Sequence, residues 1–229
     1  MESFPCFVIN LDRNPERWEK AVERIREAGF SNIQRIPGVD GKNPEVLEQE
    51  WKKYNSPAFA AWDKEFVEHP GKQGCFLSHV QVWDKIISEE IPHAVVFEDD
   101  VLFHPRWKEL SALYYEKTPD DYEVLYMGSQ IEFNSMYHVD KGPVFCTNAM
   151  VVSLAGAKKL KACVFSKPVY TVDCMLIDQM RSGWDLKWVV WNARRFFPTD
   201  IQNMPKGWTK RNTGLVFQDE SFGSEVRIW

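Results

Sequence analysis

Three adjacent carboxylates, Glu98, Asp99 and Asp100, directly follow an apolar run at residues 94–97. Such a run is typical of a buried strand, and ligands of open α/β sheets bind at the carboxyl ends of strands. Carboxylate oxygens are preferred ligands of hard divalent cations, which often also hold the phosphates of a substrate. Adjacent anions repel one another, so burying all three requires a counter-charge. The run indicates either a metal-and-phosphate site or a polar turn that ends a strand.

Two arginines stand at another junction between a strand and a helix. Residues 4–11 predict a buried strand, and Asn14 with Pro15 predicts the start of a helix. Arg13 and Arg17 therefore lie near a helix N-terminus, whose free N–H groups favour an anion. Arginine adds planar, bidentate recognition of phosphate. The pair indicates either a phosphate contact or a solvated first turn.

Ser78 and His79 are adjacent within a predicted helix at residues 74–89. Neighbouring residues of a helix point about 100° apart, so this pair cannot act as the serine and histidine of a hydrolase. The chain also has no Gly-x-Ser-x-Gly motif. His79 is then either a buried, hydrogen-bonded residue near Trp83 or a contact to a bound substrate.

Composition argues against several classes of protein, among them nucleic-acid-binding and membrane-spanning proteins. The 229 residues are 44% hydrophobic, which suits one large domain, and 28 basic against 33 acidic residues give a net charge of −5. That balance gives no reason to expect nucleic-acid binding. No apolar run is long enough to span a membrane and no leader sequence is visible, so we expect a cytoplasmic protein with at most a peripheral membrane contact. Five cysteines without a C-x-x-C pair indicate neither a disulfide framework nor a zinc site.

Strand and helix patterns alternate along the chain, which predicts one α/β domain over residues 1–229. We expect strands at residues 4–11, 32–36, 94–97, 123–127, 144–153 and 186–191, and helices at 15–28, 74–89, 107–116, 155–162 and 171–181. Residues 43–63 look partly helical, and 68–72 and 128–142 look like loops. Residues 194–229 show little periodicity and predict an irregular tail that wraps or caps the site.

Several short motifs occur in an order that resembles glycosyltransferase family 25, which includes lipooligosaccharide β-galactosyltransferases and collagen-hydroxylysine galactosyltransferases. The resemblance extends from Phe7 to about Val226. It departs from the family at Met150, where an aromatic residue is usual, and in lacking the second transferase domain of the collagen enzymes. The motifs are Val8-Ile9-Asn10-Leu11-Asp12-Arg13 with Arg17, Gly38-Val39-Asp40-Gly41, Gly74-Cys75-Phe76-Leu77-Ser78-His79, Val96-Phe97-Glu98-Asp99-Asp100-Val101, Ser153-Leu154-Ala155-Gly156-Ala157, Val172-Asp173, and Gln218 with Phe222-Gly223-Ser224.

The resemblance implies a GT-A-type, Rossmann-like nucleotide-sugar transferase fold with a largely parallel central sheet. It also implies metal-dependent, inverting transfer of a hexose, with galactose favoured, from a UDP-sugar to a saccharide or hydroxylated acceptor. The cofactor would be Mn²⁺ or Mg²⁺. Two rivals are a metal-dependent phosphohydrolase and a carbohydrate- or nucleotide-sugar-binding protein of the same fold without turnover.

The same resemblance implies roles for particular residues. Asp100 would bind the metal directly, and Glu98 would contact the donor or the metal and its water, whereas the role of Asp99 is open. Asp173, at the start of a helix, would be the catalytic base, with Asp178 as second choice. Donor-binding residues would be Asn10, Leu11, Arg13, Arg17, Ser78, His79 and Glu98.

Overall fold

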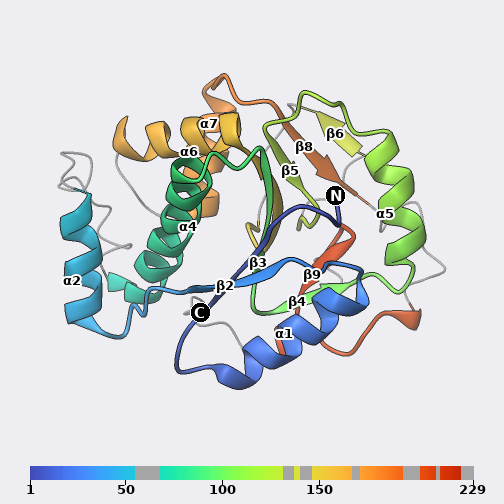
Figure 1. Ribbon diagram of the computed structural model, residues 1–229, viewed down its shortest axis with the longest axis horizontal. Coiled ribbons are helices and arrows are strands. Elements are labelled where there is room, and N and C mark those ends of the chain that lie inside the picture. Colours follow the sequence, from blue (N-terminus) through green and yellow to red (C-terminus); the bar gives the residue numbers. More distant parts are fainter. Residues whose placement is uncertain are drawn as a thin grey trace.

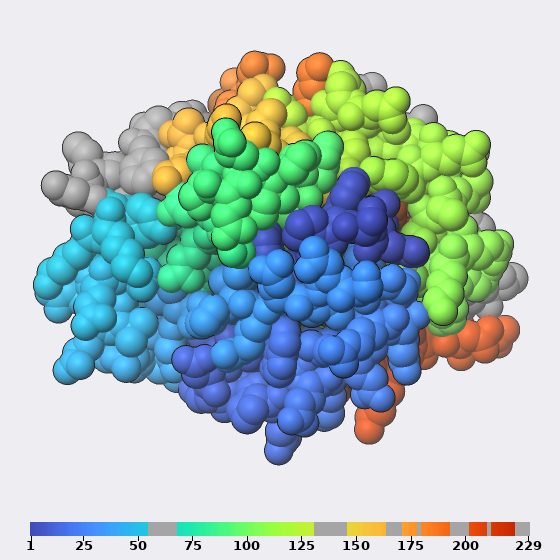
Figure 2. Space-filling model, in the orientation of Figure 1, coloured from blue at the N-terminus to red at the C-terminus, as the bar shows by residue number. Residues whose placement is uncertain are grey.

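The computed structural model describes residues 1–54, 68–130, 137–139, 146–166, 171–192, 202–209 and 212–222. For residues 137–139, 164–166, 178 and 179 it describes the backbone alone. Helices pack on both faces of a central sheet, as Figure 1 shows. In the space-filling view helix α4 (Pro70–Ser88) lies above and helix α1 (Pro15–Glu27) below on the side turned toward the reader (Figure 2).

The central sheet has seven strands in the order β2-β1-β3-β7-β5-β8-β6. Within the described residues, β1 runs parallel to β2 and β3, and β5 runs parallel to β8, while β7 and β6 run antiparallel to their neighbours. Five strands therefore share one direction, and the expected α/β fold with a largely parallel sheet is confirmed. The strands are β1 (Cys6–Asn10), β2 (Ile33–Pro37), β3 (His93–Glu98), β5 (Val124–Tyr126), β6 (Tyr137–Val139), β7 (Ala149–Ser153) and β8 (Trp188–Trp191).

Successive side chains of β3 point to opposite faces of the sheet and so pack in two separate hydrophobic cores. Ala94 and Val96 join the core under α4, α6 and α7, whereas Val95 and Phe97 join the core under α1 and α5. By the same alternation Glu98 belongs to the α4 side of the sheet. The helices are α1 (Pro15–Glu27), α2 (Pro44–Lys53), α4 (Pro70–Ser88), α5 (Trp107–Glu116), α6 (Leu154–Ser166) and α7 (Val172–Arg181), and a 3₁₀ turn, η3, covers Glu220–Phe222.

The prediction of a loop at residues 68–72 is wrong. Pro70 is the first residue of α4, where its missing N–H costs nothing and its fixed φ suits the helix. The glycines of two motifs let this helix start pack closely. A Cβ on Gly41 would lie 1.8 Å from the Pro70 carbonyl oxygen, and one on Gly74 would lie 2.3 Å from that of Val39. The loop after β2 therefore packs backbone to backbone against α4.

A second, two-stranded sheet pairs β4 (Val101–Phe103) with β9 (Val216–Gln218) in antiparallel register. The sequence pattern predicted neither strand, and β9 lies within the segment that was expected to be irregular. Their pairing joins the residues that follow the acidic run to the C-terminal part of the chain. Among the described helices, none has the length and apolar character needed to cross a lipid bilayer.

Candidate functional site

Parallel pairing brings the ends of β1 and β3 side by side. Ile9 is in register with Glu98, so Asn10 and Asp99 are the next residues of neighbouring strands. The Asn10 side-chain amide donates to Asp99 Oδ2 at 2.7 Å. Asn10, which was expected to contact the donor, is thus a side-chain partner of the acidic run.

Arg17 provides the counter-charge that the acidic run requires. Its Nη2 atom lies 2.5 Å from Asp99 Oδ1 and 3.5 Å from Asp100 Oδ2. The arginine side chain is 13% exposed, so these contacts are largely shielded from water. Arg17 was expected to contact a diphosphate, and in the structure its partners are these two carboxylates.

Asp100 is a buried carboxylate with one oxygen unused. Gln218 of β9 donates its amide to Oδ2 at 3.0 Å, while Oδ1 is buried without a hydrogen-bond partner among the described residues. Burial, and then the nearby charge of Glu98, raise the pKa of Asp100 to about 7. Buried carboxylate oxygens are normally satisfied, so this atom fits a missing ligand such as a divalent cation.

Glu98 points toward α4 and is held by two donors on one oxygen. His79 Nε2 and Thr147 Oγ1 each lie 3.2 Å from Glu98 Oε1. Burial tends to raise the pKa of Glu98, but the hydrogen bond and charge of His79, with Thr147 and Arg17, hold it below its ordinary value. His79 is fully buried with its ring 6.3 Å from that of Trp83. It is therefore a buried, hydrogen-bonded residue that also belongs to the acidic site.

Ser78 and Arg13, both expected at the donor, hold the loop after β2. The Ser78 hydroxyl accepts from the Val39 amide at 2.9 Å and donates to the Gly74 carbonyl at 2.6 Å. Arg13 Nε lies 2.8 Å from Asp40 Oδ2. The Gly38–Gly41 motif is thereby fixed between the first loop of the chain and α4. Leu11, partly buried, packs near Gly38 of the same loop.

Asp173, the expected catalytic base, lies in the first turn of α7. One of its oxygens accepts from the Cys174 amide at 2.9 Å. Burial, followed by the charges of Glu98, Asp173 and Asp100, raises the pKa of the Cys75 thiol well above its usual value. Asp173 is thus near enough to Cys75 for its charge to act on the same thiol as the charges of Glu98 and Asp100. The side chain of Asp178 is outside the described residues.

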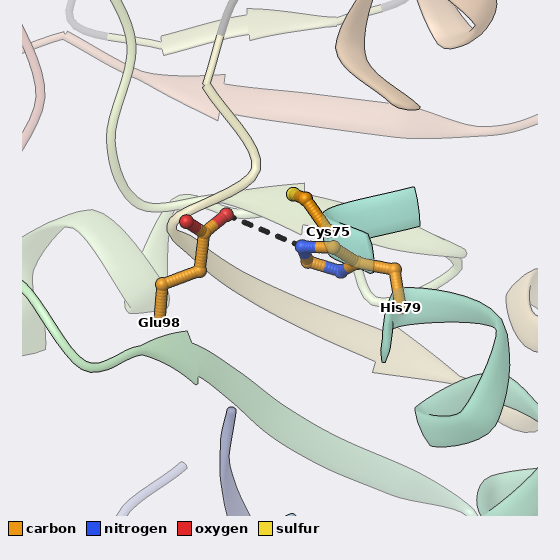
Figure 3. A group of neighbouring side chains, drawn as sticks. All are labelled: Cys75, His79 and Glu98. Atoms are coloured by element: carbon orange, nitrogen blue, oxygen red, sulfur yellow. Dashed lines mark hydrogen bonds and ion pairs between the residues drawn. The ribbon is translucent and has the colours of Figure 1, made fainter. Parts of the chain in front are cut away.

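Cys75, His79 and Glu98 form a compact group of possible metal ligands (Figure 3). Their ligand atoms all lie within 4.8 Å of one another. Sequence reasoning missed Cys75 because it looked for cysteine pairs, whereas this group joins residues four apart on a helix to the end of a strand. It also gave no role to Thr147 or Gln218. Gln218 belongs to the ordered set of family motifs, and this was the signal that could have indicated a role at the site.

Comparison with known proteins identifies the family of this chain. Residues 4–141 match the family described as "Glycosyltransferase family 25 (LPS biosynthesis protein)", a shorter stretch than the expected resemblance. A glycosyltransferase 25 family member of Drosophila pseudoobscura pseudoobscura is 29% identical over 170 residues, 68% of this chain and 26% of that protein. Human procollagen galactosyltransferase 2 is 30% identical over 169 residues, 67% of this chain and 26% of that protein.

A third relative carries the word "inactive" in its name. The Bos taurus protein called "Probable inactive glycosyltransferase 25 family member 3" is 30% identical over 174 residues, 68% of this chain and 28% of that protein. The chain spans about a quarter of the length of these curated relatives.

Among solved structures, a glycosyltransferase involved in glycosylation of the major capsid of PBCV-1 aligns with a TM-score of 0.49 and 8% identity, over 94% of this chain and 91% of that one. The family match covers more than half of the 229 residues and contains the first loop, the α4 start and the acidic run. The chain therefore belongs to glycosyltransferase family 25.

Proposed function

We propose that this protein transfers a hexose, with galactose favoured, from a UDP-sugar to a saccharide or hydroxylated acceptor, with inversion and with Mn²⁺ or Mg²⁺ as cofactor. The observation that carries the proposal is the buried Asp100 Oδ1, which has no partner among the described residues and stands near Glu98 at the end of β3. Membership of glycosyltransferase family 25 supports the reaction class.

In this proposal Asp100 and Glu98 hold the divalent cation. Such a cation, when bound, neutralises the charge that develops on the leaving diphosphate. Gln218 donates to Asp100 Oδ2 and so leaves Oδ1 for the cation. Arg17 pairs with Asp99 and lowers the repulsion within the acidic run. Arg13, at the surface of the same edge, is proposed to contact the diphosphate.

Asp173 is proposed to accept the proton of the acceptor hydroxyl. The hydroxyl oxygen then bonds to the anomeric carbon while the bond from sugar to phosphate breaks, and the electron pair of that bond leaves on the diphosphate. A base at this place needs to be near the donor without binding the cation. The influence of Asp173 on Cys75, shared with Glu98 and Asp100, supports such a position.

A second candidate is a protein that binds a nucleotide sugar without turnover. Relatives named as inactive members of the family, one from cattle and one from mouse, support keeping this candidate. It predicts donor binding that depends on Asp100 and no release of UDP with any acceptor.

The test is UDP release from a panel of UDP-sugars with Mn²⁺, with and without EDTA, in the presence of galactoside, lipooligosaccharide and hydroxylysine-peptide acceptors. We expect release from one donor that EDTA abolishes and that Asp100→Asn lowers at least about 100-fold. Asp121→Asn is a matched control, since Asp121 pairs with Lys187 on the surface. Release that survives EDTA and Asp100→Asn would contradict the proposal. Release of inorganic phosphate would indicate a hydrolase, and donor binding without release would indicate the binding protein.

A further inference from the structure

We propose that Cys75, His79 and Glu98 form a binding site for Zn²⁺ or a similar thiophilic transition-metal ion, distinct from the proposed hard-cation site at Asp100 although the two share Glu98. This assignment goes beyond the proposed transferase activity and does not depend on it. It rests on how α4 and β3 bring a thiol, an imidazole and a carboxylate together.

Helix geometry aligns the first two ligands. Cys75 and His79 are four residues apart on α4, so they share one face of the helix. Figure 3 shows both side chains turned toward Glu98, which extends from the end of β3. The His79 Nε2 to Glu98 Oε1 separation is 3.2 Å. Two ligands bonded to a tetrahedral zinc ion at about 2.0 Å lie about 3.3 Å apart, so this pair already has the required spacing.

The chemistry of the group selects a soft or borderline ion. Thiolate and imidazole bind Zn²⁺ well, whereas Mg²⁺ and Mn²⁺ prefer oxygen ligands. Three protein ligands leave a fourth position for water, as in open zinc sites. The Glu98 side chain is 23% exposed and Cys75 is only partly buried, so an ion can reach the group from solvent.

Charge around the thiol also favours a cation. Glu98, Asp173 and Asp100 all act on Cys75, and their negative charges disfavour a bare thiolate. Metal binding replaces the S–H proton, which passes to solvent, with a bond from sulfur to the metal. The imidazole binds through Nε2 with its proton on Nδ1. Binding replaces the Nε2 hydrogen bond to Glu98 with a bond to the metal, and it leaves the proton on a buried Nδ1 that has no hydrogen-bond partner in the described part of the chain, which lowers the affinity.

Glu98 is common to both metal sites. On the proposed function, an ion bound to Cys75, His79 and Glu98 would withdraw Glu98 from the donor cation. Zn²⁺ would then lower transfer at concentrations far below those of Mn²⁺, without displacing the ion at Asp100.

Binding is tested with Co²⁺ as a probe, because Zn²⁺ has no d–d spectrum. The whole protein is titrated with Co²⁺ without any donor. We expect a thiolate-to-cobalt charge-transfer band that saturates at one equivalent, disappears on adding Zn²⁺ and survives excess Mg²⁺. Cys75→Ser should remove the band, and Glu98→Gln should weaken Co²⁺ binding at least about 10-fold, since even partners outside the ligand shell have that effect.

Two control variants distinguish this site from another cysteine and from the proposed transferase site. Cys174→Ser changes another free, partly buried cysteine outside the group and should keep the band. Asp100→Asn should keep the band while losing Mn²⁺-dependent UDP release, which separates this site from the proposed transferase site. Circular dichroism and the melting temperature check that each variant is folded. A folded wild type without the band, or a band that persists in Cys75→Ser, would overturn the proposal.

Discussion

Asp99 and Asp100 are neighbours in the chain, but their oxygens meet different partners. Both oxygens of Asp99 are used, one by Asn10 and one by Arg17. Asp100 has one oxygen bound by Gln218 and one buried without a partner in the described residues. Asp99 thus stabilises the fold and Asp100 is the residue available for a ligand. Asp99, whose role was open, contacts Asn10 and Arg17.

This difference predicts different effects of the two substitutions on stability. Asp99→Asn removes the nearer carboxylate partner of Arg17 in a largely buried place, so the free energy of unfolding should fall. The fall should be about 1 to 3 kcal/mol, because burial also disfavours the charge of Asp99 and Asp100 remains near Arg17. Asp100→Asn removes a buried charge that Glu98 repels, so stability should stay the same or rise. Urea denaturation of the two variants measures both. Equal destabilisation by the two substitutions would contradict the distinction.

His93, at the start of β3, allows a prediction about pH. Burial lowers the pKa of His93, whose ring stacks on Phe4 at 5.3 Å. The unfolded chain therefore binds more protons than the folded one just below the ordinary histidine pKa of about 6.5. Stability contributed by neutral His93 is present above that pH and is lost as the pH falls. His93→Gln should have a shallower loss of stability between about pH 6.5 and 5 than the wild type, by urea denaturation. An unchanged slope would show that His93 does not contribute.

The β4–β9 pair is the element that holds the acidic run to the C-terminal segment. The Asp219 amide donates to the Asp100 carbonyl at 2.6 Å, and Arg24 of α1 pairs with Asp219 at 2.8 Å. Phe222 of η3 then lies under three cations of α1, at 5.2 Å from Arg17, 5.0 Å from Lys20 and 5.5 Å from Arg24. These contacts fix the helix that carries the counter-charge of the site.

The ring of Phe222 should therefore matter beyond its apolar area. Phe222→Leu keeps much of that area but loses the cation–π contacts, so we expect a loss of about 1 kcal/mol in the free energy of unfolding. Phe222→Trp keeps an aromatic face and should retain most of the stability. Denaturation curves compare the three proteins. Equal stability of the Leu variant and the wild type would show that apolar area alone explains the contact.

Elements with long, clear periodicity were predictable, whereas three of the four described three-residue strands were not. The helix at residues 107–116 was predicted with the bounds that α5 has, and β1, β3 and β8 were found near their expected places. Strands β4, β6 and β9 have three residues each, too few to show an alternating pattern. Strand β5 is as short, but its fully buried run of apolar residues was predicted as part of a strand at 123–127. The position of the other three depends on partners distant in the chain, which no local pattern describes.

At the scale of the whole molecule, the site is assembled from segments that are far apart in the sequence. Glu98 and Asp100 could be identified from the sequence because both belong to one short acidic run. Gln218 donates to Asp100 across 118 residues, and Thr147 reaches Glu98 across 49. Such partners follow from sheet order and from the β4–β9 pairing, so the sequence could suggest the candidate residues Glu98 and Asp100 but not the residues that orient them.

A cation at Asp100 would join these segments and should stabilise the whole fold. An ion that binds only the folded protein adds about 2.7 kcal/mol at a concentration of 100 times its Kd. We therefore expect Mn²⁺ to raise the melting temperature of the wild type and EDTA to reverse this. Asp100→Asn should show little of the increase, because Oδ1 is the atom without a partner among the described residues. Cys75→Ser should keep the increase, since its thiol belongs to the proposed zinc site. The same rise in Asp100→Asn as in the wild type would place the Mn²⁺ site elsewhere.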